Sequence, residues 1–305
     1  MTTKRIACAA AVSAVIASLT ITSCNNAPSA APAVIGEGIR FCESTLPYGD
    51  GILIANFGTD ALNPLNTEGK GYIVSWANDT AVTLIPADGH LSAPKGMFFR
   101  DGYLYICDVN KVAVYRIGED GSTFVKDIVF PEGNLFVNDL AASGNWLYAS
   151  VTNTDRIYRI DISDISAPGE PAEWLTIPGP NGIAISEGMM YVASYPADGN
   201  TQDKHIIYGI ADLDNPQPEK VITVPGQYDG IALSSDGKYL FITNWTPAGL
   251  SIVDLKTGTV TPVAVELESP LTGPADITVL NGKIYIPDLP GSRVVVIDEP
   301  ATENK

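Results

Sequence analysis

A segment of 43 to 52 residues that recurs along the chain constrains the fold more than any other feature. Each copy contains an apolar stretch, a turn and a second apolar stretch, rich in Tyr, Val and Met in the copy "NGIAISEGMMYVAS" from Asn181 and found again in "DGIALSSDGKYLFITN" from Asp229. A third strand follows, and most copies add a fourth. The six copies begin at Glu43, Lys95, Asn138, Asn181, Asp229 and Ala275. Four strands per copy at this period predict an all-β fold, a six-bladed β-propeller of four-stranded blades.

The two ends of the repeat array predict how the ring closes. The sixth copy stops after "SRVVVID" with only "EPATENK" remaining, so it lacks a fourth strand. A spare strand-like segment, "AVIGEGIRF" at 33–41, precedes the first copy. We therefore expect the N-terminal strand to complete the last blade, with residues 33–41 pairing against 291–298, because this arrangement removes a sheet edge. The expected propeller spans residues 36–300, followed by a tail at 301–305.

The N-terminus has the pattern of an export signal. Lys4 and Arg5 precede an apolar run that ends in "ITSC", which resembles the signal of bacterial lipoproteins. That resemblance implies a signal peptide at 1–23, lipidation of Cys24 and a lipidated tether at 24–35. The expected location is the cell envelope, at the outer membrane if the source is diderm. The alternative is an ordinary secretory signal in which Cys24 is incidental.

Charge narrows the range of partners. The net charge is −17, and residues 1–23 carry two basic residues and no acid, so the remainder carries −19. Such an acidic surface argues against nucleic acid and against direct electrostatic docking on anionic lipid. We expect the protein to contact the membrane through its lipid anchor. We also expect it to be a monomer. Within the expected propeller Cys42 and Cys107 remain, and they either pair or stay free.

The recurring start position predicts a site. In a propeller the first strand of each blade lines the central channel, so one residue per blade lies at the channel mouth. Four of the six carry side-chain oxygens, namely Glu43, Asn138, Asn181 and Asp229, and none is His or Cys. Oxygen ligands of this kind suit a hard cation such as Ca²⁺ or Mg²⁺. The alternative is that Asn and Asp at these positions only satisfy turn amides.

The longer connections predict a pocket at the same mouth. The three elaborated loops are "FGTDALNPLNTEGK" (57–70), "YPADGNTQDK" (195–204) and "WTPAG" (245–249). All three join second to third strands, so they lie at the end where the channel strands begin. Long loops around one channel mouth are typical of a ligand pocket. Candidate substrate contacts are Lys95, Tyr48, Tyr228 and Trp245.

Four motifs resemble the family of senescence marker protein, gluconolactonase and luciferin-regenerating enzyme. They are Glu43, "ND" at 138–139, "PNGIAIS" at 180–186 and "DGIALSSDGK" at 229–238. The resemblance implies a divalent metal, Ca²⁺ first and Mg²⁺, Mn²⁺ or Zn²⁺ otherwise. Its ligands would be Glu43, Asn181 and Asp229, with Asn138 a ligand or substrate contact. It further implies that Asp229 is the catalytic base.

The expected function is therefore divalent-metal-dependent hydrolysis of lactones or related esters, with a small molecule such as a sugar lactone as substrate. His90 and His205 lie outside the recurring position and no Gly-x-Ser-x-Gly is present, which argues against a Ser-His-Asp hydrolase. No phosphate-loop or dinucleotide motif occurs. The alternative is a non-catalytic propeller that binds a ligand or a protein.

Overall fold

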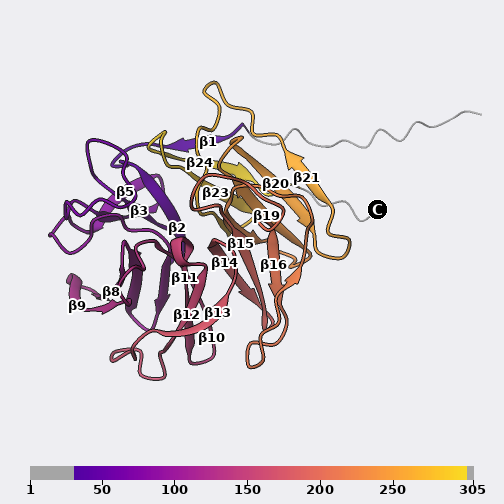
Figure 1. The fold of residues 1–305 in the computed structure, drawn as a ribbon. Coiled ribbons are helices and arrows are strands. Elements are labelled where there is room, and N and C mark those ends of the chain that lie inside the picture. Colours follow the sequence, from indigo (N-terminus) through magenta and orange to yellow (C-terminus); the bar gives the residue numbers. More distant parts are fainter. Residues whose placement is uncertain (1–30, 301–305) are drawn as a thin grey trace, which may run out of the picture.

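The computed structural model describes residues 31–300, which form six four-stranded antiparallel sheets arranged in a ring in chain order (Figure 1). Blade one contains β2 (Cys42–Tyr48), β3 (Gly51–Asn56), β4 (Tyr72–Ala77) and β5 (Thr80–Ile85). Blade two contains β6 (Met97–Arg100), β7 (Tyr103–Asp108), β8 (Lys111–Gly118) and β9 (Gly121–Val129). Blade three contains β10 (Val137–Ser143), β11 (Trp146–Val151), β12 (Arg156–Asp161) and β13 (Ala172–Thr176), with one 3₁₀ turn, η1 (Thr152–Thr154), after β11.

Blades four to six repeat this order. Blade four contains β14 (Pro180–Ser186), β15 (Met189–Ser194), β16 (Ile207–Ile210) and the short β17 (Glu219–Lys220). Blade five contains β18 (Tyr228–Leu233), β19 (Tyr239–Asn244), β20 (Gly249–Asp254) and β21 (Val260–Val263). Blade six contains β22 (Thr278–Leu280), β23 (Lys283–Asp288), β24 (Arg293–Asp298) and β1 (Ala33–Ile35). The predicted six-bladed propeller is confirmed.

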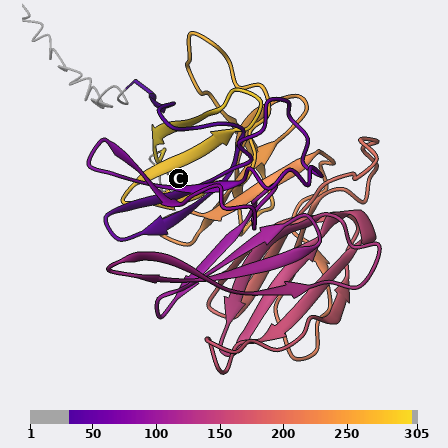
Figure 2. The ribbon, with the colours of Figure 1, turned by 90° about the vertical axis from the view of Figure 1, so that its left-hand side faces the viewer.

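The ring closes with the N-terminal strand, as predicted. Strand β1 pairs antiparallel with β24, with Ala33 opposite Val296 and Ile35 opposite Val294, and Figure 2 shows it beside the last blade. The pairing covers three residues of the expected nine, because the chain turns away at Gly38, whose φ is +70°. The propeller thus begins at Ala33, inside the stretch expected to be tether. Residues 1–30, including Cys24, and residues 301–305 lie outside the described residues.

The first strand of each blade is the innermost. Each stands at one end of its sheet, and the first strands of adjacent blades contact one another around the whole ring, from β2 through β6, β10, β14 and β18 to β22 and back to β2. The apolar cores fill the spaces between adjacent blades.

In residues 31–300 no helix is long and apolar enough to cross a membrane.

The two cysteines within the described residues do not pair with each other. Cys42 and Cys107 are both free and fully buried. The Cys42 thiol donates to the Arg293 carbonyl (3.1 Å), and burial raises the pKa of both thiols. They therefore serve as small apolar core residues rather than as a crosslink.

Candidate metal centre at the channel mouth

The six recurring positions occupy equivalent places around the channel mouth. We call these six residues the ring residues, and the set they form the ring. Glu43, Asn138, Asn181 and Asp229 are each the second residue of a channel strand, β2, β10, β14 and β18 respectively. The other two, Lys95 and Ala275, lie just before β6 and β22. All six are buried, and Asp229, at 8%, has the largest exposed fraction.

A β-bulge accompanies each of the four oxygen-bearing positions. The pairing of the first two strands shifts register between Cys42 and Ser44, Val137 and Leu140, Pro180 and Ile183, and Tyr228 and Ile231. In each case the channel strand carries one extra residue. Bulges redirect side chains and are common beside functional sites. The repeated bulge thus distinguishes these four residues from ordinary members of the ladder.

In four blades, hydrogen bonds to the second strand hold the segment that leads into the channel strand. The last side chain of the second strand accepts a backbone amide from the segment leading into the first. The bonds are Arg40 to Asn56 (3.1 Å), Ala93 to Asp108 (2.7 Å), Gln227 to Asn244 (2.8 Å) and Gly273 to Asp288 (2.9 Å). The entry segments are therefore held within their own blades, which limits the freedom of the ring residues that follow them.

The four predicted ligands share a deficit of hydrogen bonds. Seven buried side-chain oxygens lack a partner within residues 31–300, and four of them are Glu43 Oε2, Asn138 Oδ1, Asn181 Oδ1 and Asp229 Oδ1. An unpaired buried oxygen costs about 1–3 kcal/mol, so native proteins seldom leave several together. Two carboxylate and two amide oxygens suit a hard divalent cation. No group of three or more His, Cys, Asp or Glu suited to a metal occurs in the described chain, so such a site would depend on both amides.

The electrostatics of the ring are dominated by buried carboxyl groups. Burial raises the pKa of Glu43 well above its usual range, and the Asp229 carboxyl raises it further, while Lys95 lowers it. Burial, with a contribution from Asp276, raises the pKa of Asp229 to about 8. Burial lowers the pKa of Lys95, and Glu43 opposes that shift. The ring without a cation therefore favours protonated carboxyl groups.

Two buried aspartates beside the ring, Asp139 and Asp276, were given no role from the sequence, although Asp139 belongs to the "ND" motif at 138–139. Asp139 accepts the amides of Leu140 (2.7 Å) and Ile183 (2.6 Å), and so joins blade three to blade four. Asp276 accepts the Ser44 hydroxyl (2.8 Å), and so joins blade six to blade one. Burial raises the pKa of Asp276 to about 7. The sequence signal that could have identified them is their position, because each directly follows a ring residue.

Glycine occupies that following position in three other blades. A Cβ at Gly96 would lie 2.2 Å from Asp139 Oδ1, and one at Gly230 would lie 2.5 Å from the Ala275 carbonyl. Both contacts are too close for any side chain. Adjacent blades therefore approach each other at the ring more closely than any residue but glycine permits.

An apolar collar surrounds the same end of the channel, and of its residues the sequence predicted only Trp245 as part of the site. We use this name for Phe41, Phe57, Val109, Phe136, Tyr195, Trp245 and Leu289. Five of these directly follow the last residue of a second strand, and this shared position is the signal by which the sequence could have identified them. Phe57 and Leu289 pack with the ring residue Ala275, and Phe41, Val109 and Trp245 pack against them, partly buried. Burial and the nearby Asp229 charge raise the pKa of Tyr195 to about 12.

The expected substrate contacts divide into two groups. Lys95 and Trp245 lie at the ring and in the collar. Tyr48 lies at the opposite end of β2 from Glu43 and packs edge-on against Phe99, 5.1 Å between centroids. The Tyr228 hydroxyl donates to the Val224 carbonyl (3.0 Å), and its ring is part of the core between blades. The structure therefore does not bring Tyr48 to the ring. The Tyr228 hydroxyl is hydrogen-bonded to a backbone carbonyl of the segment that leads into its own strand, β18.

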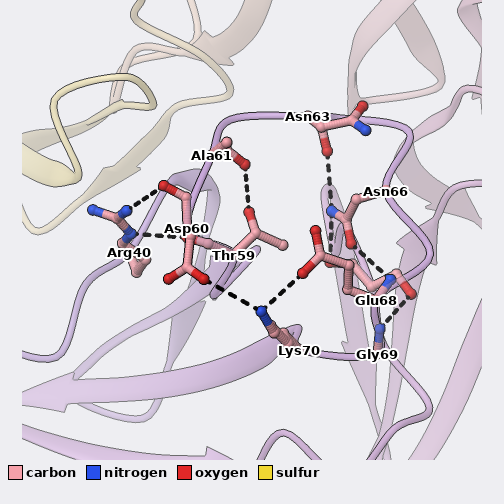
Figure 3. Close-up of polar contacts among 10 residues, drawn as sticks. Arg40, Thr59, Asp60, Ala61, Asn63, Asn66, Glu68, Gly69 and Lys70 are labelled. Atoms are coloured by element: carbon pink, nitrogen blue, oxygen red, sulfur yellow. Dashed lines mark hydrogen bonds and ion pairs between the residues drawn. The ribbon is translucent and has the colours of Figure 1, made fainter.

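The insertion at 57–70 is held by a polar network of its own at this end of the channel (Figure 3). Arg40 donates to the carbonyls of Thr59 (2.9 Å) and Asp60 (2.7 Å). Lys70 lies 2.9 Å from Glu68 and 3.6 Å from Asp60. These bonds tie the loop to the segment that enters β2, so the insertion is an ordered part of the mouth.

The fold and the ring together define a six-bladed β-propeller with a polar centre at its channel mouth. Comparison with known proteins supports this class. A family model described as LVIVD repeat matches residues 136–176, which is blade three. No curated protein matches the chain.

One similar solved structure is a structural genomics protein of unknown function from Bacteroides thetaiotaomicron. The TM-score is 0.60 at 15% identity, and the match covers 85% of this chain and 70% of that one. At this identity the likeness supports the fold alone. The resemblance to the gluconolactonase family is not confirmed by these comparisons.

Proposed function

We propose that this protein is a divalent-cation-dependent hydrolase of lactones or related esters. The observation that supports it is the set of four buried oxygens without partners, on Glu43, Asn138, Asn181 and Asp229. These side chains would hold the cation. Ca²⁺ is the first candidate, with Mg²⁺, Mn²⁺ and Zn²⁺ as alternatives. When bound, such a cation polarises a substrate carbonyl and stabilises the oxyanion that forms.

The chain itself would supply the proton transfers. Asp229 is the more exposed of the two ring carboxyl groups, and its second carboxylate oxygen, the one that does not hold the cation, would accept a proton from water. The water oxygen bonds to the carbonyl carbon, the acyl C–O bond of the lactone breaks, and the leaving oxygen takes up the proton. The product is a hydroxy acid. Lys95 would orient the substrate from the opposite side of the ring.

A second candidate is a non-catalytic propeller that binds a small ligand or a protein at the same end. The burial of the ring beneath the collar favours it, since no ring residue exceeds 8% exposure. A cation held there would then stabilise the channel rather than act on a substrate. Propellers serve both purposes, so the fold does not decide between them.

The test combines metal content with turnover. Protein purified without chelators is expected to carry about one equivalent of divalent cation by plasma mass spectrometry. It should hydrolyse at least one member of a panel of sugar, aliphatic and aromatic lactones when supplied with Ca²⁺, Mg²⁺, Mn²⁺ or Zn²⁺. Bound metal without turnover would favour the binding module, and protein that binds no cation would refute the metal centre.

We also propose that the protein is an envelope lipoprotein anchored through Cys24. The support is the "ITSC" motif after an apolar run. Wild-type protein is expected to partition into detergent, and Cys24→Ser to appear in the soluble envelope fraction, because the acyl chains supply the membrane affinity. Mass spectrometry of the mature N-terminus checks this directly. A mature chain that begins at another residue would contradict the lipid anchor.

A further inference from the structure

Lys95 has hydrogen-bonding capacity that the protein does not use. Its side chain is fully buried, and in the part of the chain that the structure describes its ammonium donates only to the Ala93 carbonyl (2.9 Å). An ammonium group has three N–H donors. Within residues 31–300 no carboxylate lies within ion-pair distance of it. Burying such a group with a single bond is costly, which indicates that a further acceptor belongs beside it.

Aromatic rings flank this ammonium. The Phe136 and Phe57 centroids lie 5.0 and 5.6 Å from Lys95 Nζ. Both rings belong to the collar, and Phe136 is only partly buried. The neighbours of the unused donors on this side are therefore apolar, and a ligand oxygen that reached Lys95 would bring the rest of the ligand against aromatic rings.

The other accessible residues of the collar, unlike the polar insertion at 57–70, have the same apolar character. Phe41, Val109, Tyr195 and Trp245 are partly exposed collar residues, and Leu135, beside Phe136, is 46% exposed. Hydroxyl groups of a sugar need several polar partners, because an unmet hydroxyl loses its bonds to water. Apolar and aromatic groups instead gain from burial against such a surface.

We infer that the ligand of this site is an aromatic or similarly apolar lactone or ester, whose carbonyl oxygen accepts a hydrogen bond from Lys95 while its ring packs on the collar. The inference rests on the proposed function for the reactive group, but it replaces the polyhydroxylated sugar with an apolar body. Lys95 and the collar then determine specificity, while the four ring oxygens serve the cation.

Two lactams test this without turnover, because an amide keeps the carbonyl but resists hydrolysis. Dihydroquinolinone represents the aromatic lactone, and gluconolactam represents the sugar lactone. Isothermal titration calorimetry of the full propeller in Ca²⁺ is expected to show saturable binding of dihydroquinolinone. Gluconolactam is expected to bind at least tenfold more weakly. Equal or tighter binding of gluconolactam would overturn the inference.

Variants assign the contacts. Lys95→Met keeps most of the length of the side chain but cannot donate a hydrogen bond, and it should weaken the binding of dihydroquinolinone at least tenfold while leaving the cation content unchanged. Phe136→Ala should weaken it similarly through the lost ring contact. Lys238→Met, an exposed lysine on the β18–β19 turn, is the matched control and should bind like wild type. Unchanged binding by folded Lys95→Met would refute the role of Lys95.

The outcomes separate this inference from the proposed function. Lactam binding without turnover of any lactone would support the inference and contradict the hydrolase. Turnover that prefers sugar lactones, with no loss in Lys95→Met, would support the hydrolase and overturn the inference. Thermal melts of each variant show whether a loss of binding comes from unfolding.

Discussion

Asp229→Ala is expected to abolish cation binding and to lower lactone hydrolysis by at least about a hundredfold. The substitution removes one of the four unpartnered oxygens from the ring, and it removes the more exposed of the two ring carboxyl groups. Loss of a general base alone typically costs about 10²–10⁴ in rate. Asp229→Asn retains an oxygen, so it should keep part of the cation affinity while losing the rate. Metal content and turnover of the same preparations measure the two effects.

Unfolding does not account for such a loss. Because burial raises the pKa of Asp229 to about 8, its ionisation opposes folding, and Asp229→Ala should melt no lower than cation-free wild type near neutral pH. Asp120→Ala, an exposed aspartate on the β8–β9 turn at the far end of the channel, is the control and should behave like wild type. Full activity in Asp229→Ala would contradict the assignment of the catalytic base.

Removing the cation should make stability strongly dependent on pH. The folded-state pKa values of Asp229, about 8, and Asp276, about 7, both lie above the ordinary 3.8. Groups with raised pKa values stabilise the fold fully below the unfolded pKa, and this stability is lost as pH rises through the folded value. In chelator, we expect the melting temperature to fall by about 5–10 °C from about pH 6 to about pH 8.

Added Ca²⁺ should reverse that fall, because the cation offsets the repulsion between the ionised carboxylates and binds only the folded state. The increase in melting temperature should be larger at about pH 8 than at about pH 6, since protons compete with the cation for the same oxygens. Differential scanning calorimetry with Ca²⁺ and with chelator measures it. A melting temperature in chelator that rises with pH over this range would show that the ring is not a buried acidic centre.

The fold could be predicted from the sequence because its signals are local. Strand alternation, the Gly-containing turns and the recurring starts from Glu43 to Ala275 are all properties of neighbouring residues, and they predicted six blades without knowledge of contacts. The missing fourth strand of the last copy likewise predicted the pairing of β1 with β24. The same register predicted which residues stand at the channel mouth, although their role as ligands remains a prediction.

The contacts that residues at and beside the channel mouth make with other blades were decided only by the tertiary structure. Asp139 and Asp276 look like ordinary polar residues in the sequence until the packing of one blade against the next places the Ile183 amide and the Ser44 hydroxyl beside them. Tyr48 follows the local pattern of the first blade, yet its place along β2 takes it to the far end, against Phe99.

The collar and the unused donors of Lys95 depend on residues from separate blades that meet only in the closed ring. Periodicity within one blade determines which strand a residue occupies and which way it points. Burial, pKa and unmet hydrogen bonds depend on atoms supplied by other blades, which the sequence separates by tens to hundreds of residues.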